Sequence, residues 1–277
     1  MTLESKRDIN QYLSAQLTGG LGNQLFGLAT VISLAKRRNL LPAVSLYEFV
    51  SNARPFELAS ICSRIGIPFI EEHDHIYKEE SIFEYDDKIE SLQGGTRLIG
   101  YFQDYRYFHN ERALINETFL SISERKSLEK INPTIAVHVR RGDYLKPIHF
   151  QHHGVCDFAY YADSVSILRS IWGNLPVKIF SDSANSAIEL SSIIPNSSPF
   201  NDDELSSWEI LLEMSKMKCL VASNSSFSWW AGYLGQNSYG EMIIPEPWIS
   251  AKSNIGLKLP AWISLPRIGL EIPGNAD

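Results

Sequence analysis

Two adjacent arginines, followed closely by a carboxylate, form the sharpest chemical motif in the chain. They lie in HVRRGDY, which supplies Arg140, Arg141 and Asp143 at the end of the apolar run Thr134–Arg140. Guanidinium groups bind phosphate oxygens through two parallel hydrogen bonds. Alternation along an extended chain sends the arginines opposite ways, so we expect one to face an anionic ligand and the other to brace the loop through a carboxylate. Asp143 is then a brace or a base, and a purely structural Arg–Asp pair is the alternative.

Further polar residues follow two other apolar runs. Asp182 lies in the run Val177–Ser183 and is expected either to accept a hydrogen bond from a base or sugar hydroxyl or to cap a helix. His138, on the same face as Arg140, is a ligand contact or a satisfied core histidine. In SNSSFSWWAGYLG, serine hydroxyls can donate to a phosphate or cap the next helix. The positions there that we assign to ligand binding are Asn224, Ser225, Ser226 and Phe227.

A glycine-rich turn near the N-terminus is a second candidate anion site. In LTGGLGNQLFGLAT, Gly20, Gly22 and Asn23 lie between a short apolar run and a helical pattern. Glycines let the backbone turn tightly, and the helix start offers unpaired amides and partial positive charge to an anion. The spacing lacks the third glycine of the dinucleotide fingerprint and the Lys-Ser/Thr ending of a P-loop. An ordinary strand-to-helix turn is the alternative.

The elements that must position these residues alternate between strand and helix. In the first half, strands over Tyr12–Leu17 and Pro42–Tyr47 flank a helix over Asn23–Arg38. From about residue 54 to 130 the pattern is less regular, and Glu71–Glu80 is expected to be solvated. In the second half we expect strands over Thr134–Arg140, Val177–Ser183, Cys219–Ser226 and Glu241–Pro245, and helices over Asp202–Lys218 and from Phe227 onward. Because open parallel sheets bind ligands at the carboxyl ends of their strands, the polar segments are expected to meet there.

Composition excludes some classes of partner. The 277 residues carry a net charge of −7, which argues against a broad basic surface for nucleic acid. The three cysteines are far apart and no Cys/His cluster has zinc-ligand spacing, so we expect neither a disulfide framework nor a bound metal. Without a signal-peptide core or a run of about 18 apolar residues, we expect a cytoplasmic protein with no transmembrane segment. Peripheral contact with the inner face of a membrane stays open.

Six motifs occur in the order seen in the α-1,2-fucosyltransferases, glycosyltransferase family 11, and the chain resembles that family from Gly19 to Trp248. The motifs are GGLGNQLF, GYFQDYRYF, HVRRGDY, GVCDFAYY, IFSDS and SNSSFSWWAGYLG. The resemblance implies an α/β, GT-B-like fold of two Rossmann-type lobes with parallel sheets and a cleft between them. It also implies inverting transfer of L-fucose from GDP-fucose to the 2-hydroxyl of a terminal galactose, with no cofactor and no required metal.

The resemblance further assigns roles to the two lobes and to single residues. The N-terminal lobe, residues 1–131, would bind the acceptor, and the C-terminal lobe, residues 132–277, would bind GDP-fucose. Arg140 would hold the donor diphosphate, with the glycine turn over it from the first lobe and Ser225 and Ser226 from the second. The family often has two acidic residues where this chain has Asp182 and Ser183.

The acceptor and the base remain open at this level. We expect a galactose-terminated glycan, lipid-linked or soluble, contacted by the aromatic stretch GYFQDYRYF, although core packing is the alternative for its rings. The candidate acceptor residues are Tyr101, Gln103 and Tyr105. Asp143 is the candidate base, with His138, His149, His152 and His153 as alternatives. A transferase for another sugar nucleotide and a non-catalytic nucleotide- or glycan-binding module are the rival functions.

Overall fold

The computed structural model describes residues 8–45, 55–202, 204–235, 241–249 and 256–267. The chain divides into two compact units, and we describe each by itself. Unit 1 comprises Met1–Ser121 with Ile255–Leu257, and unit 2 comprises Ile122–Asn254 with Lys258–Asp277. This division differs from the predicted one at 131/132 because α4 (Ile122–Leu128) packs against α8 (Ser207–Ser215). There, Trp208 Nε1 donates a 2.8 Å hydrogen bond to the Glu124 carboxylate.

Unit 1 is built on a parallel sheet. Within the described residues, its four strands follow the order β2-β1-β4-β3, and every pairing is parallel. The strands are β1 (Tyr12–Gln16), β2 (Leu41–Ser45), β3 (His75–Lys78) and β4 (Thr96–Ile99). The α-helices are α1 (Leu21–Arg38), α2 (Ala59–Ile65) and α3 (Arg112–Phe119), and the 3₁₀ turns are η1 (Ile9–Gln11), η2 (Asp87–Ser91), η3 (Tyr105–Tyr107) and η4 (His109–Glu111). Parallel pairing places all four carboxyl ends at one edge of the sheet.

Helix α1 begins earlier than the sequence predicts. Its first residue is Leu21 and its N-cap is Gly20, so Gly22 lies in the first helical turn. The helix packs on β1 and β2 and buries most of its surface between Leu21 and Ala35. It ends at Arg38, where Asn39 adopts the left-handed conformation that commonly closes a helix. The basic last turn matches the negative end of the helix dipole.

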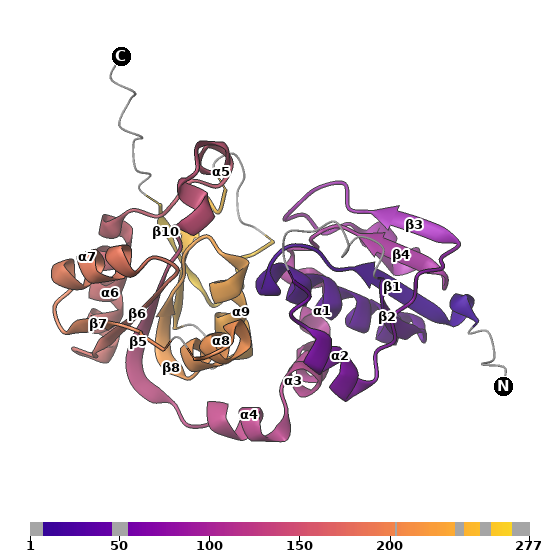
Figure 1. Ribbon diagram of the computed structural model, residues 1–277, viewed down its shortest axis with the longest axis horizontal. Helices are drawn as coiled ribbons and strands as arrows, with labels where there is room; N and C mark the ends of the chain where they lie inside the picture. Colours follow the sequence, from indigo (N-terminus) through magenta and orange to yellow (C-terminus); the bar gives the residue numbers. More distant parts are fainter. Residues whose placement is uncertain (1–7, 46–54, 203, 236–240, 250–255, 268–277) are drawn as a thin grey trace, which may run out of the picture. The chain divides into compact units, whose positions relative to one another are not determined.

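Unit 2 contains a larger parallel sheet (Figure 1). In the described part of the unit, its six strands follow the order β10-β9-β8-β5-β6-β7. The strands are β5 (Asn132–Val139), β6 (Val177–Ser181), β7 (Ser197–Pro199), β8 (Met217–Val221), β9 (Met242–Glu246) and β10 (Ile263–Pro266). The remaining helices are η5 (Gly142–Leu145), α5 (Pro147–His153), α6 (Phe158–Trp172), α7 (Ala184–Ile193) and α9 (Ser226–Leu234). This is the Rossmann strand order, whose two halves meet at β5 and β8.

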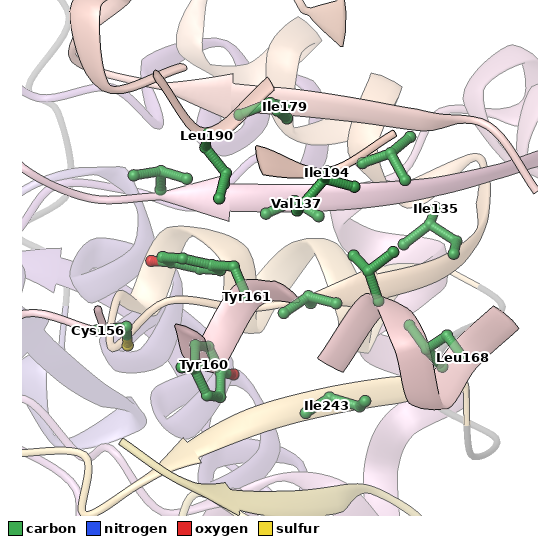
Figure 2. Packing of buried hydrophobic residues seen from close by; sticks show 14 of the residues in the cluster. Ile135, Val137, Cys156, Tyr160, Tyr161, Leu168, Ile179, Leu190, Ile194 and Ile243 are labelled. Atoms are coloured by element: carbon green, nitrogen blue, oxygen red, sulfur yellow. The ribbon is translucent and has the colours of Figure 1, made fainter. Parts of the chain in front are cut away.

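Strand β5 separates two helical layers. Its residues Ile135, Val137 and Val139 pack in a buried cluster with side chains of α6 and α7 (Figure 2). On the opposite face of the strand, the ring of His138 lies 5.6 Å from that of Phe227 in α9. Figure 1 accordingly shows α6 and α7 on one side of the sheet and α8 and α9 on the other. Because side chains alternate along β5, successive residues that follow the strand point toward opposite helical layers.

Several element predictions need correction. The predicted helix over Asp202–Lys218 is wrong at both ends, because Ser206 and Glu209 form a capping box and β8 has already begun at Met217. Two strands, β3 and β4, lie in the stretch predicted as irregular. β3 lies within Glu71–Glu80, whose side chains are mostly exposed, as predicted. An edge strand with mostly exposed side chains carries no apolar alternation to reveal it. Of the predicted segments, Leu46, Tyr47 and Asp203 lie outside the described residues.

Candidate active site

The strand order of unit 2 places two polar segments at one point. Strands β5 and β8 are neighbours, and the chain runs from β5 outward to β6 and β7 on one side and from β8 to β9 and β10 on the other. Ligands of open parallel sheets bind outside the carboxyl ends of the strands where the order reverses. The segments that follow these two strands are the arginine loop, Arg140–Tyr144, and the serine junction, Ser223–Ser226.

Arg140 presents its guanidinium at this edge. Its side chain is 24% exposed, and it forms ion pairs with Asp143 (2.5 Å) and with Asp182 (2.7 Å). The guanidinium carbon also lies 5.2 Å from the centre of the Tyr144 ring. Three neighbours therefore fix the direction of the guanidinium, while part of the side chain remains open to solvent.

Arg141 enters the opposite layer, as alternation predicts. Only 3% of its surface is exposed, and its guanidinium lies over the ring of Phe158 at the start of α6. It donates to the carbonyl oxygen of Arg140 at 3.1 Å. The expectation that the inward arginine braces the loop through a carboxylate is wrong, because both carboxylates pair with Arg140 instead.

Asp182, which follows β6, contacts the arginine loop. Its Oδ1 accepts a 2.8 Å hydrogen bond from the backbone N–H of Arg141, and its Oδ2 accepts from Arg140. The helix-cap alternative is wrong, since Ser183 is the N-cap of α7 and accepts from the amide of Ser186. The sequence pattern does not predict this bridge. The register that pairs Val139 with Ser181 brings the two strand ends together.

His138 is buried beside the same loop. One ring nitrogen, Nδ1, lies 2.8 Å from the hydroxyl of Ser223, so the histidine links β5 to the end of β8. Burial, with a smaller contribution from the positive charge of Arg140, lowers the pKa of His138 to about 3. The side chain is thus neutral near pH 7 and joins two strands, as the satisfied-histidine alternative describes.

The serine junction is closely tied to its surroundings. Asn224 donates from its side-chain amide to the carbonyl oxygens of His153 and Gly154, so that group is occupied in holding the end of α5. Ser225 caps α9 by accepting from the amide of Phe227, which is the capping alternative for this serine. Because β8 is the neighbour of β5, the sheet edge that carries the arginine loop also carries Asn224, Ser225, Ser226 and Phe227.

Tyr144 also lies at this site, although the sequence motif HVRRGDY predicts no separate role for it. Its ring stacks on that of His153 at 4.6 Å, and its hydroxyl lies 3.4 Å from the carbonyl oxygen of Asn224. Burial raises the pKa of the Tyr144 hydroxyl to about 12. His149 is 6.3 Å from His153, ring centre to ring centre, and the side chain of His152 lies outside the described part. The position of Tyr144 directly after Asp143 is the sequence signal that could have identified it.

In unit 1, the glycine turn follows β1 and is closed by side chains of the same unit. Gln24 donates to the carbonyl oxygens of Gly19 (2.8 Å) and Pro55 (2.9 Å). The first helical amide, that of Leu21, donates to the carboxylate of Glu57 at 3.0 Å. Glu57 therefore already supplies the negative charge that the start of α1 favours. Nothing in the local pattern pointed to Glu57, which is 36 residues away in sequence.

The predicted acceptor stretch lies beside the glycine turn in this unit. β4 pairs with β1, and Gln103 donates a 2.7 Å hydrogen bond to the side chain of Asn23. Tyr101 is 39% exposed, whereas Tyr107 in the same stretch is fully buried in the core. Tyr105 begins η3 and packs its ring against His109. Gln103 and Asn23 are thus brought together, and Tyr101 and Tyr105 remain predictions as acceptor contacts.

The described residues offer neither a metal site nor a membrane-spanning helix. No three side chains among His, Cys, Asp and Glu are grouped there so as to hold a metal ion. None of the described helices combines the length and apolar character needed to span a bilayer. Metal-independent chemistry therefore stays a prediction.

Comparison with known proteins adds a family match and two relatives. The model described as Glycosyl transferase family 11 matches residues 3–265. The chain is 28% identical to an alpha-1,2-colitosyltransferase of Escherichia coli, over 84% of this chain and 91% of that protein. It is 26% identical to the O-antigen biosynthesis glycosyltransferase WbnK of Escherichia coli, over 90% of this chain and 99% of that protein.

Among solved structures, the fold is similar to that of the fucosyltransferase NodZ from Bradyrhizobium. The TM-score is 0.52 at 14% identity, covering 81% of this chain and 93% of that one. NodZ crystals soaked with GDP-fucose give a TM-score of 0.51 at 15% identity, covering 81% of this chain and 92% of that one. At this identity the likeness concerns the fold alone, and it confirms the α/β, GT-B-like class predicted from the sequence.

Proposed function

The chain belongs to glycosyltransferase family 11, and from that premise we propose that it transfers L-fucose from GDP-fucose to the 2-hydroxyl of a terminal galactose in a glycan. Membership in the family makes it a glycosyltransferase, whereas the sugar, linkage and acceptor belong to the proposal. Support for the donor comes from NodZ, which has the same fold and has been soaked with GDP-fucose. Support for an acceptor in O-antigen synthesis comes from the name of WbnK.

The observation that carries the proposal is the partly exposed side chain of Arg140, with its guanidinium fixed by two carboxylates, at the switch point of the Rossmann sheet. In transfer from a nucleotide sugar, negative charge grows on the departing diphosphate as the glycosidic bond breaks. A fixed cation at that position stabilises the transition state more than the ground state. No metal or cofactor is required in this proposal, because Arg140 supplies the positive charge.

Asp143 is the proposed base, and the proposed reaction is a single displacement with inversion. The acceptor oxygen forms a bond to the anomeric carbon, while the bond from that carbon to the phosphate oxygen breaks. The acceptor proton passes to the Asp143 carboxylate, and the bonding pair leaves with GDP. The transition state has oxocarbenium character, as in glycoside hydrolysis. His138 is a poor alternative base, since its pKa of about 3 makes it a weak proton acceptor.

The remaining site residues are proposals of binding. In unit 2 the residues proposed to serve donor binding are Arg140, Ser225, Ser226 and Phe227 as contacts, and His138, Arg141, Asp182 and Asn224 as residues that position them. In unit 1 they are Gly20, Gly22 and Asn23. Tyr101, Gln103 and Tyr105 are the proposed acceptor contacts. The acceptor is a galactose-terminated glycan, and a lipid-linked form of it would require contact with a membrane surface.

Transfer of colitose is the second candidate, favoured by the 28% identical colitosyltransferase. Colitose is fucose without its 3-hydroxyl, so the two donors differ by one polar group. A site that hydrogen-bonds this hydroxyl rejects the deoxy sugar strongly, whereas an apolar pocket discriminates weakly.

The deciding experiment compares sugar donors on one acceptor. The protein is incubated with lactose and, in turn, GDP-fucose, GDP-colitose, UDP-galactose and CMP-sialic acid, with excess EDTA present. We expect α-1,2-fucosyllactose from GDP-fucose at a higher kcat/KM than any other product. Faster transfer of colitose moves the assignment to the second candidate. GDP binding without any sugar transfer contradicts the enzymatic proposal, and activity restored only by Mg²⁺ or Mn²⁺ contradicts the metal-free mechanism.

A further inference from the structure

Two carboxylates share one guanidinium at the proposed donor site. Arg140 pairs with Asp143 at 2.5 Å and with Asp182 at 2.7 Å. One positive and two negative side chains leave this group with one net negative charge when all three are ionised. A diphosphate approaching Arg140 therefore meets two competitors of its own sign. One carboxylate must give way for bidentate binding of a phosphate group.

Asp182 is the carboxylate that the fold holds in place. It follows β6, a different strand from the one that carries Arg140, so its two hydrogen bonds join two strand ends. Gly142 shows how tightly it fits: a Cβ added there would lie 2.5 Å from Asp182 Oδ2. Moving Asp182 away would leave the backbone N–H of Arg141 without the acceptor that it has now.

Asp143 is placed differently. It lies three residues after Arg140, in the short helix η5, and its pairing joins two positions of the same loop. Its side chain is 31% exposed and that of Asp182 is 26% exposed, so the difference between the two carboxylates lies in the backbone N–H of Arg141, which Asp182 also holds. A pair between nearby side chains at such exposure contributes little free energy.

We propose that Asp182 is a positioning residue that keeps hold of Arg140 throughout, while the donor diphosphate takes the place of Asp143 on that guanidinium. This inference rests on the proposed function. The exchange ends the ion pair between Asp143 and Arg140 when the donor binds. Asp182 thereby acts through Arg140 on the donor and touches no reacting atom.

The test is calorimetric titration of the full chain with GDP, using two variants that alter the same guanidinium. Asp143→Asn removes the competitor and is expected to bind GDP about two- to fivefold more tightly. In Asp182→Asn the new side-chain NH₂ group is a donor and cannot accept from the Arg140 guanidinium, so Arg140 loses this anchor. This variant is expected to bind GDP about tenfold more weakly. Asp157→Asn, which alters the carboxylate that caps α6, is the matched control and should bind as the parent does.

Steady-state kinetics separate positioning from general damage. Asp182→Asn should mainly raise the KM for the donor, whereas Asp143→Asn should lower kcat without raising that KM. If Asp182→Asn does not fold, Gly142→Ala displaces the same carboxylate without changing charge and should weaken GDP binding likewise. Weaker GDP binding in Asp143→Asn, or unchanged binding in Asp182→Asn, overturns the inference alone. A parent that binds no nucleoside diphosphate overturns the proposed function together with it.

Discussion

The glycine turn of unit 1 and the arginine loop of unit 2 occupy corresponding places in their sheets. Each directly follows an inner strand of a parallel sheet, β1 in one unit and β5 in the other. The glycine turn is closed by its own unit, because Glu57 accepts from the first amide of α1 and Gln24 holds the turn. The arginine loop instead keeps part of the Arg140 side chain exposed.

This difference shows that a strand-to-helix turn does not by itself make an anion site. The amides at a helix start favour any nearby anion, including a carboxylate of the same chain. A guanidinium held by neighbours yet open on one side adds a charge and a geometry that phosphate matches. We therefore assign the main diphosphate contact to unit 2, and each following prediction could break or sharpen that contrast.

The largest effect is expected for Arg140→Ala. Loss of the guanidinium should reduce kcat by at least about 10²–10³, because a preorganised charge at the leaving group is removed. Arg140→Lys keeps the charge but loses the planar fork, so it should also be strongly impaired. Transfer assays measure the rate, and a melting curve near that of the parent serves as control. Parent-like turnover in Arg140→Ala would move attention to Arg141.

A pair of glycine variants compares the two regions directly. Gly142 has φ +31°, and an added Cβ would meet Asp182, so Gly142→Ala should weaken GDP binding about tenfold. Gly20 has φ −78°, and no atom lies within 4 Å of an added Cβ, so Gly20→Ala should fold as the parent does. Titration with GDP measures the affinity of each variant for the nucleotide. A greater loss in Gly20→Ala would mean that the diphosphate lies against the glycine turn.

Acid should affect unit 2 through His138. Its folded pKa of about 3 is below the ordinary value of 6.5, chiefly because of burial, so the unfolded chain binds the proton first as pH falls. The stability that depends on neutral His138 is complete above about pH 6.5 and is lost as pH falls toward 3, by at most about 1.4 kcal/mol per pH unit. Denaturant titrations between pH 7 and 4 should show a shallower decline in His138→Asn. An identical decline in both proteins contradicts this account.

The smallest effect is expected for Glu57→Gln. The variant keeps an oxygen for the amide of Leu21 but loses the charge at the start of α1, which should lower stability by about 0.3–1 kcal/mol. GDP affinity should change less than twofold. Tighter GDP binding in this variant would show that Glu57 competes with the diphosphate, and would contradict the assignment of the main diphosphate contact to unit 2.

The sequence predicts the α/β fold well where strands are buried on both faces. The runs before Arg140 and before Asp182 are almost wholly apolar, and the strands β5 and β6 are found there. The sequence does not reveal β3 and β4, because apolar and polar residues do not alternate along these short strands. The order of strands, which places β8 beside β5, depends on pairing between distant segments that no local pattern shows.

The sequence predicts which polar segments lie at one sheet edge better than it predicts the contacts between their side chains. The arginines, Asp182 and the serine junction do meet at one sheet edge, since parallel strands bring their carboxyl ends together. Which carboxylate pairs with which arginine depends on the direction of each side chain after its strand ends. The bridge from Asp182 and the capping of α1 by Glu57 arise only from tertiary packing.

The central claim is that the arginine loop holds the donor diphosphate, and a structure with GDP bound tests it most directly. We predict a β-phosphate oxygen at about 2.7–2.9 Å from the Arg140 guanidinium. Asp182 should remain paired with Arg140, and Asp143 should have moved away from it. A diphosphate bound elsewhere, with the Arg140–Asp143 pair still intact, would contradict the claim.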